Sequence, residues 1–222
     1  MAPRVILLDA LGTLLELEPP APRLRALLRE RHGLDVELDA AALALRSEMR
    51  HYRDNCIAAS DEAALEQLRL ECASIIAREL GAPALDPREL VPTLLESIAF
   101  APYAEVPDTL ARWHGEGRRL VVASNWDISL HDVLERTGLR EHIDAVATSA
   151  EVGAAKPDPA LFTAALALVD AQPQDALHIG DQLEEDVEGA RAAGIEGVWL
   201  RREATEAAAP DGIRVIASLD EL

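Results

Sequence analysis

Val5-Ile-Leu-Leu-Asp9-Ala-Leu-Gly-Thr13 is the stretch of sequence that decides the fold. Its first four residues are all apolar, which is typical of a strand buried on both faces of a parallel sheet. The run ends at Asp9, and Gly12 permits a tight turn after the strand. Ligands of open α/β sheets bind beyond the carboxyl ends of the strands. Asp9 is therefore the first candidate for a functional residue.

Beyond residue 101, short apolar runs alternate with helical stretches. This alternation predicts a parallel sheet with helices on both faces. The predicted strands are 120–123, 145–148, 176–179, 197–200 and 214–217, and the predicted helices are 107–114, 128–137, 159–169 and 184–193. Residues 203–212 are rich in Ala, Glu and Pro, and we expect a surface loop there.

Residues 20–100 carry helical periodicity and few strand signals. The predicted helices are 23–31, 40–57, 62–80 and 87–98, which together would form a bundle of about four helices. The sequence therefore predicts an α/β fold with a Rossmann-like parallel sheet core. Residues 1–15 and 101–222 would form this core domain, and residues 16–100 an inserted α-helical cap domain.

The composition is that of an ordinary soluble globular protein with an acidic surface. Apolar residues make up 49% of the chain, and the formal net charge is -19. Such a charge repels phosphate backbones, so neither nucleic acid nor a membrane is an expected partner. The N-terminal apolar run is too short for a signal peptide. We expect a cytoplasmic protein, a monomer or homodimer, with Cys56 and Cys72 as free thiols and a small anionic molecule as substrate.

Lysine is almost absent from this chain. Of the 21 basic residues, only Lys156 is a lysine. Chance is one explanation. The other is that the planar guanidinium of arginine cannot replace a compact ammonium group at this position.

Four predicted strand ends carry polar residues in a fixed order. The pattern D-x-x-G-T-L begins at Asp9, S-N stands at 124–125, K-P-D-P begins at Lys156, and G-D-x-x-x-x-D begins at Gly180. This series resembles the four motifs of the haloacid dehalogenase-like (HAD) superfamily, over nearly the whole chain. The helical insert after the first motif resembles the first cap type of that superfamily, as in phosphoglycolate phosphatase-like and 2-haloacid dehalogenase-like members.

The resemblance implies a catalytic role for several motif residues. Asp9 would be the nucleophile that forms a covalent aspartyl intermediate. Thr13 would hydrogen-bond this nucleophile or simply occupy the turn. Ser124 and the main-chain N–H of Asn125 would bind the transferred group. Lys156 would hold the negative charges of nucleophile and substrate together.

The resemblance also implies a Mg²⁺ site. Its ligands would be Asp9, the backbone carbonyl of Leu11 and Asp181, with Asp186 in a supporting role. Hard oxygen ligands of this kind suit Mg²⁺.

Neighbouring residues have more ordinary interpretations. We expect His178, within a predicted strand, to belong to the core. Glu184 and Glu185 are expected to be acids of a first helical turn, where the helix dipole favours them.

Position 11 departs from the phosphatase pattern. Phosphatases of this superfamily carry an Asp there that protonates the leaving alcohol and then activates water, and Leu11 cannot transfer a proton. A non-acidic residue resembles the 2-haloacid dehalogenases, because a halide leaves without a proton. Those enzymes also carry a tyrosine six residues after the lysine, where this chain has Phe162. They need a cap arginine, for which the candidates are Arg46, Arg50 and Arg53.

The acidic fourth motif favours a phosphatase. Asp181 beside Asp9 would crowd like charges unless a cation lay between them. A cation in turn suggests a phosphorylated substrate. The favoured function is a Mg²⁺-dependent phosphatase acting on a small phosphorylated metabolite. The alternatives are a 2-haloacid dehalogenase and a non-catalytic phosphate-binding or regulatory protein.

Overall fold

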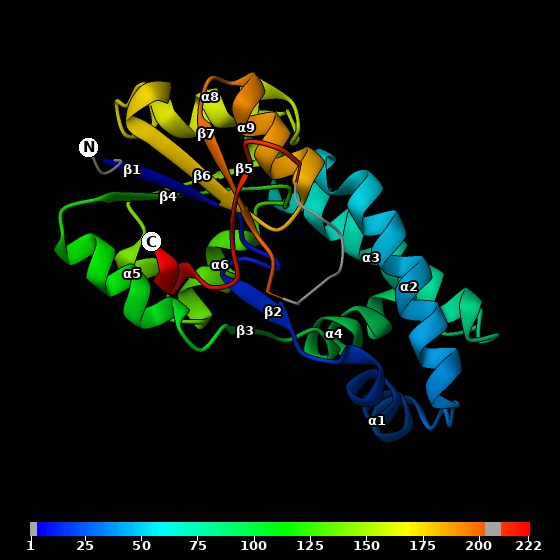
Figure 1. Ribbon diagram of the computed structural model, residues 1–222. Helices are drawn as coiled ribbons and strands as arrows, with labels where there is room; N and C mark the ends of the chain where they lie inside the picture. The colour runs from blue at the N-terminus through cyan, green and yellow to red at the C-terminus, as the bar shows by residue number, and fades with distance from the viewer. Residues whose placement is uncertain (1–3, 203–209) are drawn as a thin grey trace. The chain divides into compact units, whose positions relative to one another are not determined.

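The computed structural model describes residues 4–202 and 210–222 (Figure 1). The chain separates into two compact units. Met1–Glu16 and Pro102–Leu222 form the first, which we call the core unit. Leu17–Ala101 form the second, which we call the cap unit. The surface loop predicted at 203–212 falls largely on residues 203–209, which lie outside the described residues.

The core unit is built on a six-stranded parallel sheet, which confirms the predicted α/β fold. Its strands are β1 (Val5–Leu8), β4 (Arg119–Ser124), β5 (Ala145–Thr148), β6 (Ala176–Gly180), β7 (Glu196–Leu200) and β8 (Arg214–Ile216). Their order in the sheet is β5-β4-β1-β6-β7-β8. After β1, the chain adds β4 and β5 on one side of this strand and then β6, β7 and β8 on the other. The topological switch point therefore lies at β1, where such sheets bind their ligands.

Helices cover both faces of this sheet (Figure 1). On one face, α8 (Pro159–Ala167) and α9 (Gly189–Ala192) pack on β1 and β4 through a shared core cluster. On the other face lies α5 (Val106–Gly115). The remaining helical elements are α6 (Leu130–Arg136), α7 (Ser149–Val152), a π-helix at Leu183–Glu188, and 3-10 turns at Arg140–His142, Pro173–Asp175 and Leu219–Glu221.

One predicted helix is of a different type in the structure. The stretch expected as a single helix over 184–193 is a π-helix, Leu183–Glu188, followed by α9. π-Helical turns are rare and occur frequently at functional sites. This turn contains Asp186, whose side chain is only 1% exposed.

The chain passes between the units at two short strands. These are β2 (Leu15–Leu17) and β3 (Phe100–Pro102), which pair with each other in a two-stranded sheet. Neither strand was predicted, because three residues are too few to establish an alternating pattern.

The cap unit contains four α-helices, as its periodicity predicts. They are α1 (Pro20–His32), α2 (Leu38–Asn55), α3 (Glu62–Glu79) and α4 (Pro87–Ser97), with a 3-10 turn at Cys56–Ala58. Each helix packs on two others: α1 on α2 and α4, and α3 on the same two. No helix within the described residues is long and apolar enough to cross a membrane.

Candidate active site

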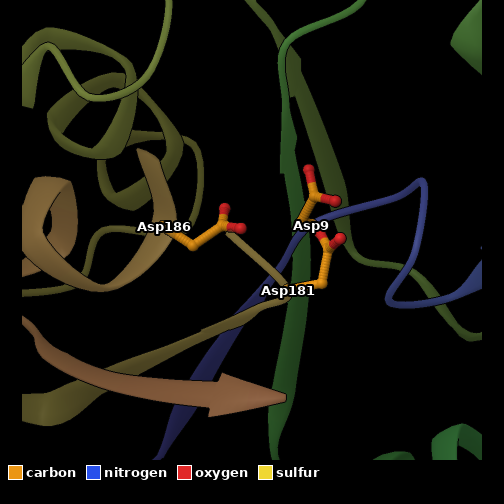
Figure 2. A group of neighbouring side chains, drawn as sticks. All are labelled: Asp9, Asp181 and Asp186. Carbon is orange, nitrogen blue, oxygen red and sulfur yellow. The ribbon is translucent and has the colours of Figure 1, made fainter. Parts of the chain in front are cut away.

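The carboxyl ends of three neighbouring strands bring the predicted site together. Asp9 directly follows β1, Ser124 ends β4 and Gly180 ends β6, and β1 lies between the other two strands. Figure 2 shows Asp9, Asp181 and Asp186 with their carboxylates turned toward a common space. One ligand atom from each of the three lies within 4.8 Å of the others.

Lys156 joins two of these carboxylates. Its ammonium nitrogen lies 2.5 Å from Asp9 Oδ1 and 2.6 Å from Asp186 Oδ1. Its side chain is only 2% exposed, so both ion pairs are shielded from water. The hydroxyl of Ser124 donates to the same Asp9 oxygen at 3.0 Å. The only lysine of the chain is therefore the cation that the buried carboxylates share.

Asp186 accepts hydrogen bonds from three protein donors. Besides Lys156, its Oδ1 accepts a hydrogen bond from His178 Nε2 at 3.0 Å. Its Oδ2 accepts one from the main-chain N–H of Gln182 at 2.9 Å. Within the described residues, three of the roughly four acceptor sites of this carboxylate are occupied, so Asp186 is better suited to position Lys156 than to bind a cation directly.

Burial and charge shift the pKa values of these groups in opposite directions. Burial raises the pKa of Asp9 to about 6, although Lys156 opposes this effect. Burial alone would raise the pKa of Asp186 too, but Lys156 and His178 hold it well below its usual range. Burial lowers the pKa of His178, so the neutral ring donates through Nε2. Of the two carboxylates that contact Lys156, Asp9 is thus the one whose negative charge is less fully compensated.

Asp181 lies against the loop that follows Asp9, and a glycine makes room for it. Gly12 has φ +86°, and a Cβ there would lie 2.6 Å from the Asp181 carboxylate. Gly180 is required in the same way, since its Cβ would meet Asp186 Cγ at 2.0 Å. Burial raises the pKa of Asp181. Two glycines therefore let two carboxylates approach the backbone at the strand ends.

The donor set fits a divalent cation. Three carboxylates face a single ammonium group, which leaves an excess of negative charge. Within the described residues, Asp9 Oδ2 and Asp181 Oδ1 accept no hydrogen bond, and neither does the carbonyl of Leu11. Two open carboxylate oxygens and one open carbonyl are the hard oxygen ligands that Mg²⁺ takes, and this ion usually keeps several waters as well.

Asn125 and Glu185 hold the main chain at Lys156. The Asn125 amide donates to the Lys156 carbonyl at 3.0 Å and accepts from its N–H at 2.7 Å. The same amide donates to Glu185 at 3.1 Å. Glu185 does lie in the first turn of a helix, as predicted, but its bond to Asn125 was not foreseen. Pairings over this sequence separation leave no local pattern.

The structure decides between the two interpretations of Thr13 and adds a contact to the predicted core residue His178. Thr13 is buried, and its hydroxyl has no hydrogen-bond partner among the described residues, so the hydrogen bond considered between Thr13 and Asp9 is not formed. His178 is fully buried, as predicted, yet it is more than a packing residue because it donates to Asp186. Its other ring nitrogen has no partner within the part of the chain that the structure describes.

The family of the chain follows from comparison with known proteins. The family model of haloacid dehalogenase-like hydrolases matches residues 3–194. That span contains all four motifs and both crossings between the units. The chain belongs to the haloacid dehalogenase-like hydrolases, and it is a hydrolase of that superfamily.

Individual relatives agree with this assignment. Haloacid dehalogenase-like hydrolase domain-containing protein 3 of Bos taurus is 32% identical over 199 residues, 86% of this chain and 79% of the relative. Phosphoserine phosphatase of Thermus thermophilus is 39% identical over 101 residues, 45% of this chain and 41% of the relative. The HAD phosphatase of Thermococcus onnurineus superposes with a TM-score of 0.66 over 98% of this chain and 95% of that one. At 24% sequence identity, this superposition supports the fold alone.

Proposed function

We propose that this chain is a Mg²⁺-dependent phosphatase that acts on a small phosphorylated metabolite. The observation that carries the proposal is the convergence of Asp9, Asp181 and Asp186 around one buried lysine. Such an arrangement concentrates negative charge where a divalent cation and an anionic substrate would meet. The relative named as a phosphoserine phosphatase supports the same reaction class.

In this proposal the bound metal would be held by Asp9, the Leu11 carbonyl and Asp181, with Asp186 supporting through Lys156. It would neutralise the charge of the transferring phosphoryl group. Asp9 would attack phosphorus as the bond from phosphorus to the leaving oxygen breaks, which forms an aspartyl-phosphate and releases the alcohol. Water would then hydrolyse the aspartyl-phosphate to inorganic phosphate and the free Asp9 carboxylate.

Other residues would prepare Asp9 and the substrate. Ser124 and Lys156 fix one carboxylate oxygen of Asp9, which leaves the second free. Lys156 would then share its charge with the substrate, and Ser124 and the main chain of Asn125 would bind the phosphoryl oxygens. Thr13 is buried, and its hydroxyl has no partner in the part of the chain that the structure describes, so it is a further donor on the loop that follows the nucleophile.

Leu11 removes the usual proton donor for the leaving group. General acid–base catalysis contributes about 10²–10⁴ in rate. We therefore expect slow turnover of ordinary alkyl phosphates. Substrates whose leaving group needs no proton, such as acyl or aryl phosphates, should be hydrolysed much faster.

The test is inorganic phosphate release from alkyl, aryl and acyl phosphates, with Mg²⁺ and with a chelator. Release by the wild type should require Mg²⁺ and should fail in Asp181→Asn. Asp54→Asn is the matched control, since Asp54 is an exposed carboxylate of α2 in the cap unit. Release that persists in chelator, or in Asp181→Asn, would overturn the proposed metal site.

A 2-haloacid dehalogenase is the second candidate, favoured by Leu11. Against it, Phe162 stands where such enzymes carry tyrosine, and it is fully buried in the core cluster, edge-on to His178. Halide release from 2-haloacids without metal, together with no phosphate release, would support this candidate. Phosphate binding without either reaction would support a non-catalytic regulatory protein.

A further inference from the structure

The guanidinium of Arg202 binds the loop that follows the nucleophile. Arg202 comes two residues after β7, and its Nε donates to the carbonyl of Gly12 at 3.2 Å. One terminal nitrogen donates to the carbonyl of Thr13 at 2.5 Å. The other pairs with Glu105 at 2.6 Å. All three nitrogens of the group are therefore in use.

The surroundings hold this guanidinium in one place. Its carbon lies 3.6 Å from the ring centroid of Tyr103, a cation–π contact. The side chains of Arg202 and Glu105 are 16% and 18% exposed, so solvent screens this pair far less than the exposed ion pairs of the chain. The main-chain N–H of Tyr103 also donates to the Leu14 carbonyl at 3.2 Å. Arg202 thus joins three segments of the core unit.

Nearly every carbonyl of residues 10–15, the loop that follows the nucleophile, accepts a hydrogen bond. The Ala10 carbonyl accepts from two main-chain N–H groups, and the Leu15 carbonyl accepts from Gly12. Those of Gly12 and Thr13 are taken by Arg202, and that of Leu14 by Tyr103. Among carbonyls 10–15, only that of Leu11 has no donor within the described residues.

Peptide planarity carries the effect of Arg202 to Leu11. The Leu11 carbonyl shares a rigid plane with the N–H of Gly12, which donates to Leu15 at 2.8 Å. The next plane holds the Gly12 carbonyl, which Arg202 fixes. Gly12, with φ +86°, is the joint between the two planes. Without Arg202, the Gly12 carbonyl would lose this hydrogen bond, and the peptide plane that follows Gly12 would be free to rotate.

We propose that Arg202 is a positioning residue that keeps the Leu11 carbonyl available to the metal ion. This inference rests on the metal-dependent function proposed above. Partners that orient metal ligands typically change metal affinity or activity by about 10–100-fold when removed. Lysine cannot reproduce the arrangement, because a single ammonium does not supply a planar fork that stacks on an aromatic ring.

The test is direct binding of Mn²⁺ alone, measured by water proton relaxation in wild type, Arg202→Met and Arg202→Lys. Asp181→Asn reports whether the ion occupies the proposed site. Arg119→Met is the matched control, because Arg119 forms a 2.7 Å ion pair with Asp144 at the opposite, amino-terminal end of β4. Circular dichroism confirms that each protein is folded, and Arg202→Lys carries the test if Arg202→Met does not fold.

We expect Mn²⁺ to bind about 10–100-fold more weakly to Arg202→Met, with a smaller loss in Arg202→Lys and none in Arg119→Met. Wild-type affinity in folded Arg202→Met, or in Arg202→Lys when only that variant folds, would overturn the inference and leave the proposed function intact. Equal losses in the Arg202 and Arg119 variants would overturn it too. Absence of binding in the wild type would overturn the proposed function itself, and the inference with it.

Discussion

The core unit and the cap unit each bury a carboxylate, and they treat it differently. In the core unit, Asp186 is 1% exposed and contacts the ammonium of Lys156 at 2.6 Å. Its pKa lies well below the usual range despite its burial. In the cap unit, Glu48 is 5% exposed, and burial raises its pKa. The Glu48 carboxylate accepts a hydrogen bond from the Cys72 thiol, a weak donor.

The difference shows what keeps a buried carboxylate charged. Desolvation favours the neutral acid unless a cation in direct contact compensates. Asp9 and Asp186, which both contact Lys156, meet that condition, and they lie at the strand ends where the four motifs converge. Buried full charges at such a position are a feature of functional sites. The raised pKa of Glu48 is the expected effect of burial.

The largest contrast should come from changing one carboxylate to an amide in each unit. Asp9→Asn should lower kcat for phosphate release by about 10⁴-fold or more, because an amide cannot replace the nucleophile. Glu48→Gln should leave kcat within about twofold, since Glu48 lies outside the four motifs. Steady-state kinetics with a saturating aryl phosphate measures both. Activity of Asp9→Asn within tenfold of wild type would remove Asp9 from the chemistry.

Adding a carboxylate to the site in the core unit should raise activity, where removing one lowers it. Leu11→Asp restores a proton donor, and we expect kcat for alkyl phosphates to rise by about 10²–10⁴-fold. Acyl phosphates, whose leaving group needs no proton, should gain little. The ratio of the two rates is the measurement. An equal gain on both substrates would mean that position 11 limits the hydrolysis of the shared aspartyl-phosphate, and no gain on alkyl phosphates would show that position 11 does not limit proton transfer.

Removing the shared cation should destabilise the core unit strongly. Lys156→Met leaves Asp9 and Asp186 buried without their partner, and a broken buried pair costs about 3–5 kcal/mol. Arg119→Met removes an exposed partner of Asp144, which should cost about 0–1 kcal/mol. Urea unfolding followed by tryptophan fluorescence reports on this unit, because Trp113, Trp126 and Trp199 all belong to it. Equal losses in the two variants would mean that Lys156 is no more than an ordinary ion-pair partner.

The smallest effect should appear in the cap unit as a dependence on pH. The raised pKa of Glu48 means that the folded state binds its proton more tightly than the unfolded state. This contribution to stability is therefore complete below the ordinary pKa of 4.5 and is lost as pH rises through the raised value. Glu48→Gln should gain about 0.5–1 kcal/mol over wild type at neutral pH and progressively less toward acid.

Far-ultraviolet circular dichroism is the appropriate probe for this variant, since the cap unit contains no tryptophan. Glu71→Gln on α3 is the control. Contacts with Gln67 and His51 lower the pKa of Glu71, so its amide variant should show no gain at neutral pH. A gain of the same size in both variants, or one that does not vary with pH, would contradict a Glu48 carboxyl whose pKa is raised by burial.

The sequence was sufficient to predict the sheet and the convergence of several motif residues at its edge. Asp9 and Asp181 each follow a strand of one parallel sheet, and Ser124 ends another. The carboxyl ends of these strands share an edge, so the position of each residue at a strand end is enough to bring the three together. Lys156 was marked by its chemistry, as the single lysine of an arginine-rich chain. Predictions of this kind depend on local pattern and on topology rules, and both held.

The partners of these residues were not predictable in the same way. Arg202 and Glu185 contact the site from other parts of the chain, and nothing in their local sequence distinguishes them from surface residues. His178 was correctly assigned to the core, but its bond to Asp186 arises from a π-helical turn that periodicity does not reveal. Strands β2 and β3 are too short to carry a pattern. Contacts between side chains far apart in the sequence are what local pattern cannot predict.

Trapping the phosphoryl group on Asp9 tests the central claim most directly. The wild type is mixed with an acyl phosphate and Mg²⁺, quenched with acid within one turnover, digested with trypsin, and examined by mass spectrometry. Cleavage after Arg4 and Arg23 releases residues 5–23, which contain Asp9. We predict that this peptide gains the mass of one phosphoryl group in the wild type with Mg²⁺, and not in Asp9→Asn. Phosphate release without any label on residues 5–23 would contradict a covalent intermediate on Asp9.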